Sequence, residues 1–160
     1  MEKTYTVQEA KARLEAYCAY QERCHREVVA KLRAMGMIPL AIGDIVVHLI
    51  HYGFLNEERY ARSFTRGKFY SKKWGKLRIQ RELKARGLTD YNIEAGLSEI
   101  TDDDYYETLN LLAEKKQAAI KEKNPYKAKA KLANFLLYRG FEPELVYEIV
   151  DELYDELYEK

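Results

Sequence analysis

The chain has 160 residues, the length of one ordinary domain, and 47% of them are hydrophobic while 33% are charged. This composition supports a buried core and excludes a disordered chain, and 8 Gly and 3 Pro are too few for a β-sandwich, β-barrel or collagen-like protein. No apolar run approaches the ~18 residues of a membrane span, and the first residues do not form a signal-peptide core. Cys18 and Cys24 provide no disulfide framework, so we expect a cytoplasmic protein without membrane contact.

The net charge is only +1, but the charged residues are segregated along the chain. Residues 59–86 contain eleven Lys or Arg and one acid, whereas residues 142–160 contain eight acids and one Lys. A looser basic run covers residues 115–131. Such segregation creates strong local fields, although solvated helix faces can also differ in sign.

The chain opens on a polar segment, and polar residues suited to cap helices recur along it. A Ser, Thr, Asp or Asn at the start of a helix satisfies free backbone N–H groups, and a following Pro fits the first helical turn. The expected caps are Thr6 with Glu9 as a capping box, Asn56, Asp102 or Asp103, and Asn124 before Pro125.

Three glycines, Gly36, Gly87 and Gly140, mark an internal repeat with spacings of 51 and 53 residues. In all three copies, apolar residues stand eight and four positions before the glycine and six and ten positions after it. These offsets are typical of a helix that ends at a glycine and is followed by another helix. The repeated apolar residues are Val28, Leu32, Ile42 and Val46, then Ile79, Leu83, Ile93 and Leu97, then Leu132, Leu136, Val146 and Val150.

Each copy has room for one more helix at its start, and no stretch shows sustained strand alternation. The sequence therefore predicts an all-α fold of three tandem three-helix repeats, over residues 1–52, 53–101 and 102–160, the second basic and the third with an acidic end. Because helical repeats contact mainly their neighbours, we expect an elongated, curved protein. The predicted helices cover residues 7–22, 25–35, 39–52, 57–70, 75–86, 90–99, 103–123, 125–139 and 143–158.

The basic residues of the second repeat fall on ordered helix faces. At about 100° per residue, the helix after Asn56 turns Tyr60 and Phe64 to one side and its cations to the other. The following helix buries Ile79 and Leu83. The cations of this predicted basic face are Arg59, Arg62, Arg66, Lys73, Arg78, Arg81 and Lys84, which Lys127 and Lys131 would extend.

Tyr70 and Trp74 alternate with lysines in the same segment. Aromatic rings among cations can stack on nucleic-acid bases or hold an arginine of a partner. Trp74 stands at the bend before Gly75, where a large aromatic residue can equally serve the core. Both interpretations of Trp74 remain open from the sequence.

The sequence gives no support for catalysis, because it contains no phosphate-binding glycine loop, metalloprotease motif or hydrolase elbow. The cysteines and histidines lack the tight spacing of structural zinc sites, and Cys18 shares an apolar helix face with Leu14 and Ala10. The acidic run 102–104 fits a helix start better than a magnesium site. We therefore predict no enzyme activity, no cofactor and no metal.

One ordered set of residues resembles the central signature of the RecX family of regulatory proteins. It consists of GFLNEERYARSF over residues 53–64, WGKLRI over 74–79 and ELKARGL over 82–88. The length, the three-part repeat and the acidic end are similar to that family too. Asn56 and Glu57 stand where family members often carry two Asp residues, and both types are compatible with a helix cap.

The resemblance implies a negative regulator of the RecA recombinase. Proteins of this family bind the RecA filament on single-stranded DNA, lodge in its groove, and restrain strand exchange and ATP hydrolysis; some also bind DNA directly. We expect a monomer whose partners are the RecA filament and single- or double-stranded DNA. The family has no catalytic residues, and the seven cations of the predicted basic face are the expected contact residues.

Two other functions remain possible from the sequence. One is a stand-alone nucleic-acid-binding helical module without sequence specificity, because residues 90–98, the recognition helix of any helix-turn-helix at Gly87, carry acids and no cation. The other is a structural adaptor whose basic face meets an acidic protein.

Overall fold

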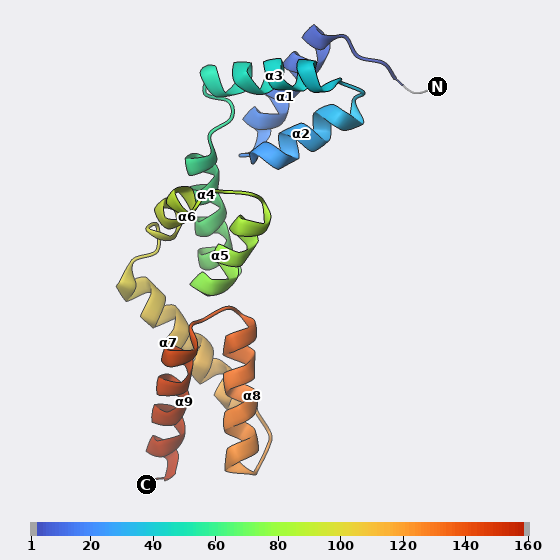
Figure 1. Cartoon of the computed structure of the whole chain (residues 1–160). Helices are drawn as coiled ribbons and strands as arrows, with labels where there is room; N and C mark the ends of the chain where they lie inside the picture. Colours follow the sequence, from blue (N-terminus) through green and yellow to red (C-terminus); the bar gives the residue numbers. More distant parts are fainter. Residues whose placement is uncertain (1–2, 159–160) are drawn as a thin grey trace. The chain divides into compact units, whose positions relative to one another are not determined.

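The computed structural model describes residues 3–158, and this part of the chain is helical without any strand (Figure 1). It contains nine α-helices and one π-helical turn, which confirms the predicted all-α repeated class. The elements are α1 (Val7–Tyr20), α2 (His25–Ala34), α3 (Pro39–His51), α4 (Glu57–Arg66), η1 (Gly67–Ser71), α5 (Lys76–Ala85), α6 (Asp90–Leu97), α7 (Asp102–Ala119), α8 (Pro125–Tyr138) and α9 (Pro143–Tyr158). None of these helices is both long enough and apolar enough to cross a membrane.

The chain is organised in two compact units. Unit 1 comprises the described residues up to Phe64 together with Leu83–Gly96, and unit 2 comprises Thr65–Glu82 together with the described residues from Leu97 onwards. Helices α4 and α5 therefore each contribute residues to both units.

The three repeat glycines all have left-handed backbone, with φ of 82° at Gly36, 83° at Gly87 and 99° at Gly140. This conformation suits glycine because it has no Cβ. In each copy, the residue after the glycine donates its N–H to the carbonyl of the leucine four positions before the glycine, which closes the helix end. These bonds join Met37 to Leu32 (3.0 Å), Leu88 to Leu83 (3.2 Å) and Phe141 to Leu136 (3.3 Å). Of the twelve repeated apolar residues, eleven are buried and Leu97 is half-buried.

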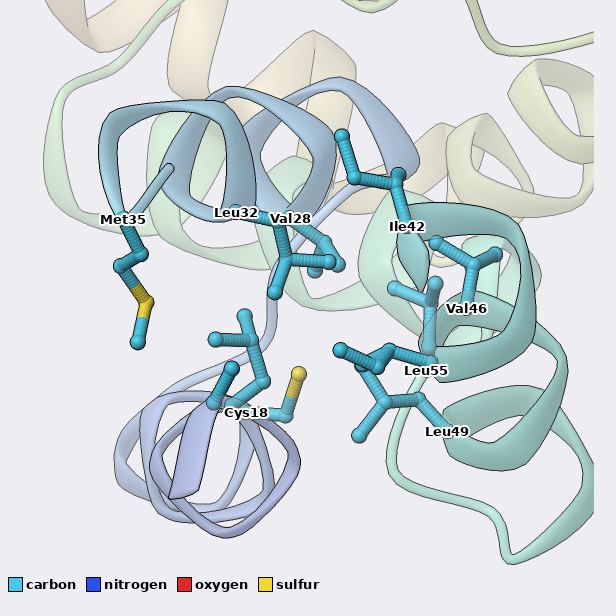
Figure 2. Packing of buried hydrophobic residues seen from close by; sticks show 11 residues of the cluster. Cys18, Val28, Leu32, Met35, Ile42, Val46, Leu49 and Leu55 are labelled. Atoms are coloured by element: carbon cyan, nitrogen blue, oxygen red, sulfur yellow. The ribbon is translucent and has the colours of Figure 1, made fainter. Parts of the chain in front are cut away.

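The core of unit 1 lies among α1, α2 and α3, where Leu14, Val28 and Leu49 are fully buried. Figure 2 shows Cys18 of α1 among side chains of α2 and α3. Cys18 is 5% exposed and Cys24 is 0% exposed, and burial raises the pKa of both thiols. The prediction that Cys18 acts as a buried small hydrophobe is confirmed.

The core of unit 2 lies among α7, α8 and α9 and includes three rings in tilted contact. The ring centroid of Tyr105 lies 5.7 Å from that of Phe69 in η1 and 5.3 Å from that of Phe141. Leu132 and Leu136 of α8 are both completely buried. The aromatic cluster thus connects the π-helical turn to α7 and to the turn between α8 and α9.

Three of the expected caps are confirmed by their hydrogen bonds, and one differs. Thr6, Asn56 and Asn124 accept backbone N–H groups of the helices that they precede. The third repeat does not begin with an aspartate cap: Thr101 Oγ1 accepts the N–H of Asp104 at 3.1 Å. The run 102–104 instead fills the first turn of α7, where carboxylates favour the positive end of the helix dipole.

Two helix ends also differ from the prediction. The helix predicted over 57–70 is α-helical only to Arg66 and continues as the π-helical turn η1. Helix α7 ends at Ala119 rather than at 123, because Ile120 is already extended. Asn124 is extended as well, as expected for a residue that precedes proline and caps α8.

Candidate functional site

The seven cations of the predicted basic face divide between the two units. Arg59, Arg62 and Lys84 belong to unit 1, and the other four belong to unit 2. Arg81 is exposed on α5. The surroundings of the other six differ from one residue to the next.

Arg59 is held by three groups of its own unit. Its guanidinium lies 2.5 Å from the Glu22 carboxylate and donates to the carbonyls of Gly53 (2.9 Å) and Phe54 (3.2 Å). These contacts connect α4 to the turn that ends α3 and to the segment after α1. Arg59 therefore stabilises unit 1, a role that the sequence pattern did not reveal.

Three other predicted cations form surface ion pairs, which contribute little to stability because water screens them. Such cations can exchange an internal carboxylate for an external anion at small cost. The pairs are Arg62 with Glu58 (3.9 Å), Arg66 with Glu99 (2.6 Å) and Lys84 with Asp90 (3.7 Å).

Lys73 and Arg78 line a cleft of about 910 Å³ within unit 2, between η1, the start of α5, α7 and α8. Its wall contains five cations and three aromatic rings, together with Ser71, Thr108, Leu111 and Leu112. No Asp or Glu is among these lining residues. The cations are Lys72, Lys73, Arg78, Lys115 and Arg139, and the rings are Trp74, Phe135 and Tyr138.

Aromatic rings flank Arg78 in this cleft. The guanidinium carbon of Arg78 lies 3.9 Å from the ring centroid of Trp74 and 5.5 Å from that of Tyr138. The Lys68 ammonium lies 4.8 Å from the Trp74 ring. Cation–π attraction of this kind orients a guanidinium without neutralising it. Trp74 is half-buried in the wall, so it is neither a core residue nor a fully exposed one.

Close backbone packing fixes one side of the cleft. Gly75 donates its N–H to the carbonyl of Arg139 at 2.8 Å, and Leu77 donates to that of Gly140 at 3.0 Å. The Arg139 guanidinium donates in turn to the carbonyl of Lys72 at 2.6 Å. A Cβ on Gly75 would collide with the Gly140 backbone, and one on Gly140 would collide with Arg78. Glycine at both positions permits this approach.

Tyr105 holds the start of α5 by a hydrogen bond. Its hydroxyl accepts the N–H of Lys76 at 2.9 Å and donates to the Glu142 carboxylate. Burial, followed by the bond to Glu142, raises the pKa of the Tyr105 phenol far above its usual range. The phenol therefore stays protonated and able to donate at any physiological pH.

Lys73 has a backbone conformation that is rare for a residue with a side chain, with φ of 59°. It ends η1: Lys73 donates its N–H to Phe69, and Trp74 donates to Lys68, both at 3.0 Å. The Lys73 ammonium donates to the carbonyl of Tyr70 at 2.7 Å. Such a conformation costs on the order of 1 kcal/mol and persists only where the surroundings fix it.

A second hollow of about 580 Å³ in the same unit shares Phe135 and Tyr138 with the cleft. Lys116, Lys121 and Lys131 line it. Lys131 also lies 3.5 Å from Glu122. The two hollows meet at the same pair of rings on α8.

Three cations of the cleft are not part of the predicted basic face: Lys72, Lys115 and Arg139. They come from segments that are far apart in the chain, so no local pattern connects them. The basic run 115–131 was a partial signal for Lys115. Lys127, the other proposed extension of the basic face, lines neither hollow and is exposed at the start of α8.

The cysteines and histidines considered for zinc serve local structure. Cys24 precedes α2, and its N–H donates to Glu27 at 3.2 Å. His25 lies 4.0 Å from Glu57, and His48 lies 3.4 Å from Glu15. In the part of the chain that the structure describes, no three His, Cys, Asp or Glu side chains are grouped as metal ligands would be.

Known protein families and relatives match this chain. Two family models match, one described as the second three-helix domain of RecX, over residues 56–97, and one described as its third three-helix domain, over residues 102–150. The "Regulatory protein RecX" of Bacillus cereus strain AH820 is 29% identical over 140 residues, and that of Bacillus anthracis strain A0248 is equally similar. Each match covers 88% of this chain and 52% of the relative, so the chain spans about half the length of these proteins.

Solved structures agree with these matches. The crystal structure of RecX from Lactobacillus salivarius superposes with a TM-score of 0.81 and 27% identity, over 92% of this chain and 96% of that one. A second crystal structure of a regulatory protein RecX has a TM-score of 0.78 over 95% of this chain and 81% of that one, and at 21% identity it supports the fold alone. The chain is thus an all-helical protein built from repeated three-helix domains. It belongs to the RecX family of regulatory proteins.

Proposed function

We propose that this protein is a negative regulator of the RecA recombinase, which binds the RecA filament on single-stranded DNA and inhibits strand exchange and ATP hydrolysis. The observation that carries the proposal is the match to two RecX three-helix domains across residues 56–97 and 102–150. In this proposal the protein acts in the cytoplasm, as a monomer and by binding rather than catalysis. It would thereby limit RecA-dependent recombination, DNA repair and the SOS response.

The proposed contact residues are the seven cations of the basic face. The cations that suit this role best are Arg62, Arg81 and Lys84. Arg81 is exposed. Arg62 and Lys84 form surface ion pairs, at 3.9 Å and 3.7 Å, in which an external anion can replace the carboxylate. Lys73 and Arg78 contribute through the acid-free cleft of unit 2. Arg59 and Arg66 would have to exchange closer internal partners, at 2.5 Å and 2.6 Å.

The test is RecA-promoted strand exchange and ATP hydrolysis with and without the protein. We expect the wild-type chain to inhibit both reactions, and the double variant Arg62→Glu/Arg81→Glu to need a concentration at least about tenfold higher, since reversed charges repel an anionic surface. The matched control is Lys31→Glu/Arg33→Glu on α2, which changes the net charge equally at two exposed positions. Arg59→Glu is unsuitable, because the loss of its contacts to Glu22, Gly53 and Phe54 would destabilise unit 1 itself.

Two results would count against the proposal. Absence of any effect of the wild-type protein on RecA would remove the proposed activity. Equal inhibition by both double variants, with unchanged helical circular dichroism, would remove Arg62 and Arg81 from the contact.

A direct contact with DNA phosphates remains the second possibility for these cations, and the aromatic rings beside Lys73 and Arg78 favour it. In a salt titration of binding to single-stranded DNA, each lost phosphate contact should reduce the slope of log affinity against log salt by about 0.7. If acidic RecA side chains are the target instead, the variants should lose inhibition while their affinity for DNA is unchanged.

A further inference from the structure

We propose that the cleft of unit 2 is a nucleotide-binding site, in which cations hold phosphate and the Tyr138 ring stacks on a base. The first argument is charge. Five cations line the cleft without an acidic side chain in its wall, so their potential is not cancelled locally. A cleft with walls of one sign concentrates field lines and attracts an anion that carries more than one charge.

The second argument is the fixed arginine. Arg78 is oriented by the Trp74 ring at 3.9 Å and the Tyr138 ring at 5.5 Å, with no carboxylate in the wall to compete for its N–H groups. A guanidinium held in one plane offers paired donors that match the oxygens of a phosphate. The hydrogen bonds from Gly75 and Leu77 to the 139–140 turn keep this donor in place before any ligand arrives.

The third argument is an exposed ring beside the cations. Tyr138 is 79% exposed, and Leu111 across the cleft is 57% exposed. An acidic peptide would use the cations but would leave this flat apolar surface in water. A nucleotide base covers such a ring by stacking, with little dependence on base identity.

The fourth argument is size and continuity. A volume of about 910 Å³ falls in the range of small-ligand sites, which suits one nucleotide better than a protein helix. The second hollow, with Lys116, Lys121 and Lys131, begins at the same rings Phe135 and Tyr138. Two cationic hollows that meet at an aromatic pair favour consecutive nucleotides of a single strand over a free nucleotide. The strand and the free nucleotide present the same phosphate and base chemistry to the site.

The chain contains its own reporter of this site. Trp74 is the single tryptophan of the sequence and lines the cleft, so its fluorescence responds to a ligand there. The experiment titrates the full chain with oligothymidylate, with ADP and with an oligoglutamate peptide, at low salt and without RecA. We expect oligothymidylate to change the Trp74 emission at lower concentration than ADP does, and the peptide to have little effect.

Two pairs of variants locate the binding. Tyr138→Ala should weaken oligothymidylate binding at least about fivefold, the lower end of what one stacked ring contributes, while Tyr126→Ala, an 84% exposed tyrosine on the same helix outside the cleft, should not. Lys115→Ala should reduce the salt slope by about 0.7, and Lys123→Ala, exposed and outside the cleft, should leave it unchanged. All four side chains are exposed, so the variants should fold.

The outcomes separate the alternatives. Tight binding of ADP that Tyr138→Ala weakens supports the site with a free nucleotide as its source, and preferred binding of the oligonucleotide supports a strand. Three results would overturn the proposal. The first is a change of Trp74 emission with the peptide but with neither nucleotide, the second is no change with any of the three ligands, and the third is an equal loss of oligothymidylate affinity in Tyr138→Ala and Tyr126→Ala. The inference shares Lys73 and Arg78 with the proposed RecA contact, but the assay contains no RecA, so either proposal can fail without the other.

Discussion

Arg59 and Arg78 come from the same signature segment and are used in opposite ways. Arg59 meets a carboxylate and two backbone carbonyls, so its donors serve unit 1 itself. Arg78 meets two aromatic rings in a wall without carboxylates, so its orientation is fixed while its charge is not neutralised. The difference shows that the positive charge of a segment does not tell which cations can meet a partner. Their neighbours in the fold decide it.

The surroundings of the two arginines also differ in what stabilises them. Around Arg59 an ionic contact contributes to the fold, whereas the cleft around Arg78 depends on apolar packing, glycine backbone and one phenol. Substitutions of these apolar, glycine and tyrosine residues should therefore lower the free energy of unfolding substantially. Substitutions of the cleft cations should lower it only slightly.

The largest effect should come from the core of unit 2. Leu136 is completely buried, and Leu136→Ala should lower the free energy of unfolding by ~2–5 kcal/mol because it leaves a cavity. Arg62→Ala, at a surface ion pair, should change it by no more than about 0.5 kcal/mol. Denaturant midpoints measure both, and equal shifts would refute the assignment of core and surface.

The next largest loss of stability should distinguish two glycines that occupy the same position in the repeat. Gly140→Ala should cost about 3 kcal/mol, since its Cβ would collide with Arg78 in addition to the left-handed strain. Gly36→Ala should cost only about 1 kcal/mol, since its Cβ would meet nothing within 4 Å. Thermal unfolding of the two variants gives the comparison, and a Gly36 variant as unstable as the Gly140 variant would remove the packing argument.

A smaller effect should follow from the phenol that holds α5. Tyr105→Phe keeps the ring but leaves the Lys76 N–H and the Glu142 carboxylate without this partner, at a cost of about 1–2 kcal/mol. Tyr106→Phe, on the exposed neighbouring residue, is the control and should be neutral. Urea unfolding measures both, and a neutral Tyr105→Phe would show that the hydroxyl does not hold the cleft.

The smallest difference in stability should be the one between substitutions of Arg59 and of a cation in the cleft. Arg59→Ala should cost about 1 kcal/mol, reduced from the value of a buried charged bond because the pair is partly exposed. Lys115→Ala in the cleft should stay within about 0.5 kcal/mol. If the two variants lose equal stability in the same buffer, the cleft cations also hold the fold and the contrast disappears.

The sequence predicted the helices well, because their signals are local. The repeated glycines, the caps at Thr6, Asn56 and Asn124, and the apolar offsets all act within a few residues. The π-helical turn was missed, since Gly67–Ser71 shows no pattern that distinguishes it from an α-helix. Thr101 was overlooked as a cap because three aspartates follow it.

The site could be predicted only in part, because its contacts are not local. Arg139 bonds to the carbonyl of Lys72, and Tyr70 donates to Asp104 at 2.8 Å, in pairings that depend on how the helices of unit 2 pack. Helical periodicity told which side of one helix is polar. It contained no information on which acids elsewhere in the chain would face that side, and such acids, Glu22 and Glu99, pair with Arg59 and Arg66.

The two buried thiols and the single tryptophan belong to different units, Cys18 and Cys24 to unit 1 and Trp74 to unit 2. A buried thiol with a raised pKa reacts with an alkylating reagent only when its surroundings open, so labelling in native buffer measures the opening equilibrium of unit 1. Tryptophan emission along a denaturant gradient follows unit 2. The native residues thus permit a measurement, without any substitution, of whether the two units unfold as one cooperative transition or in sequence.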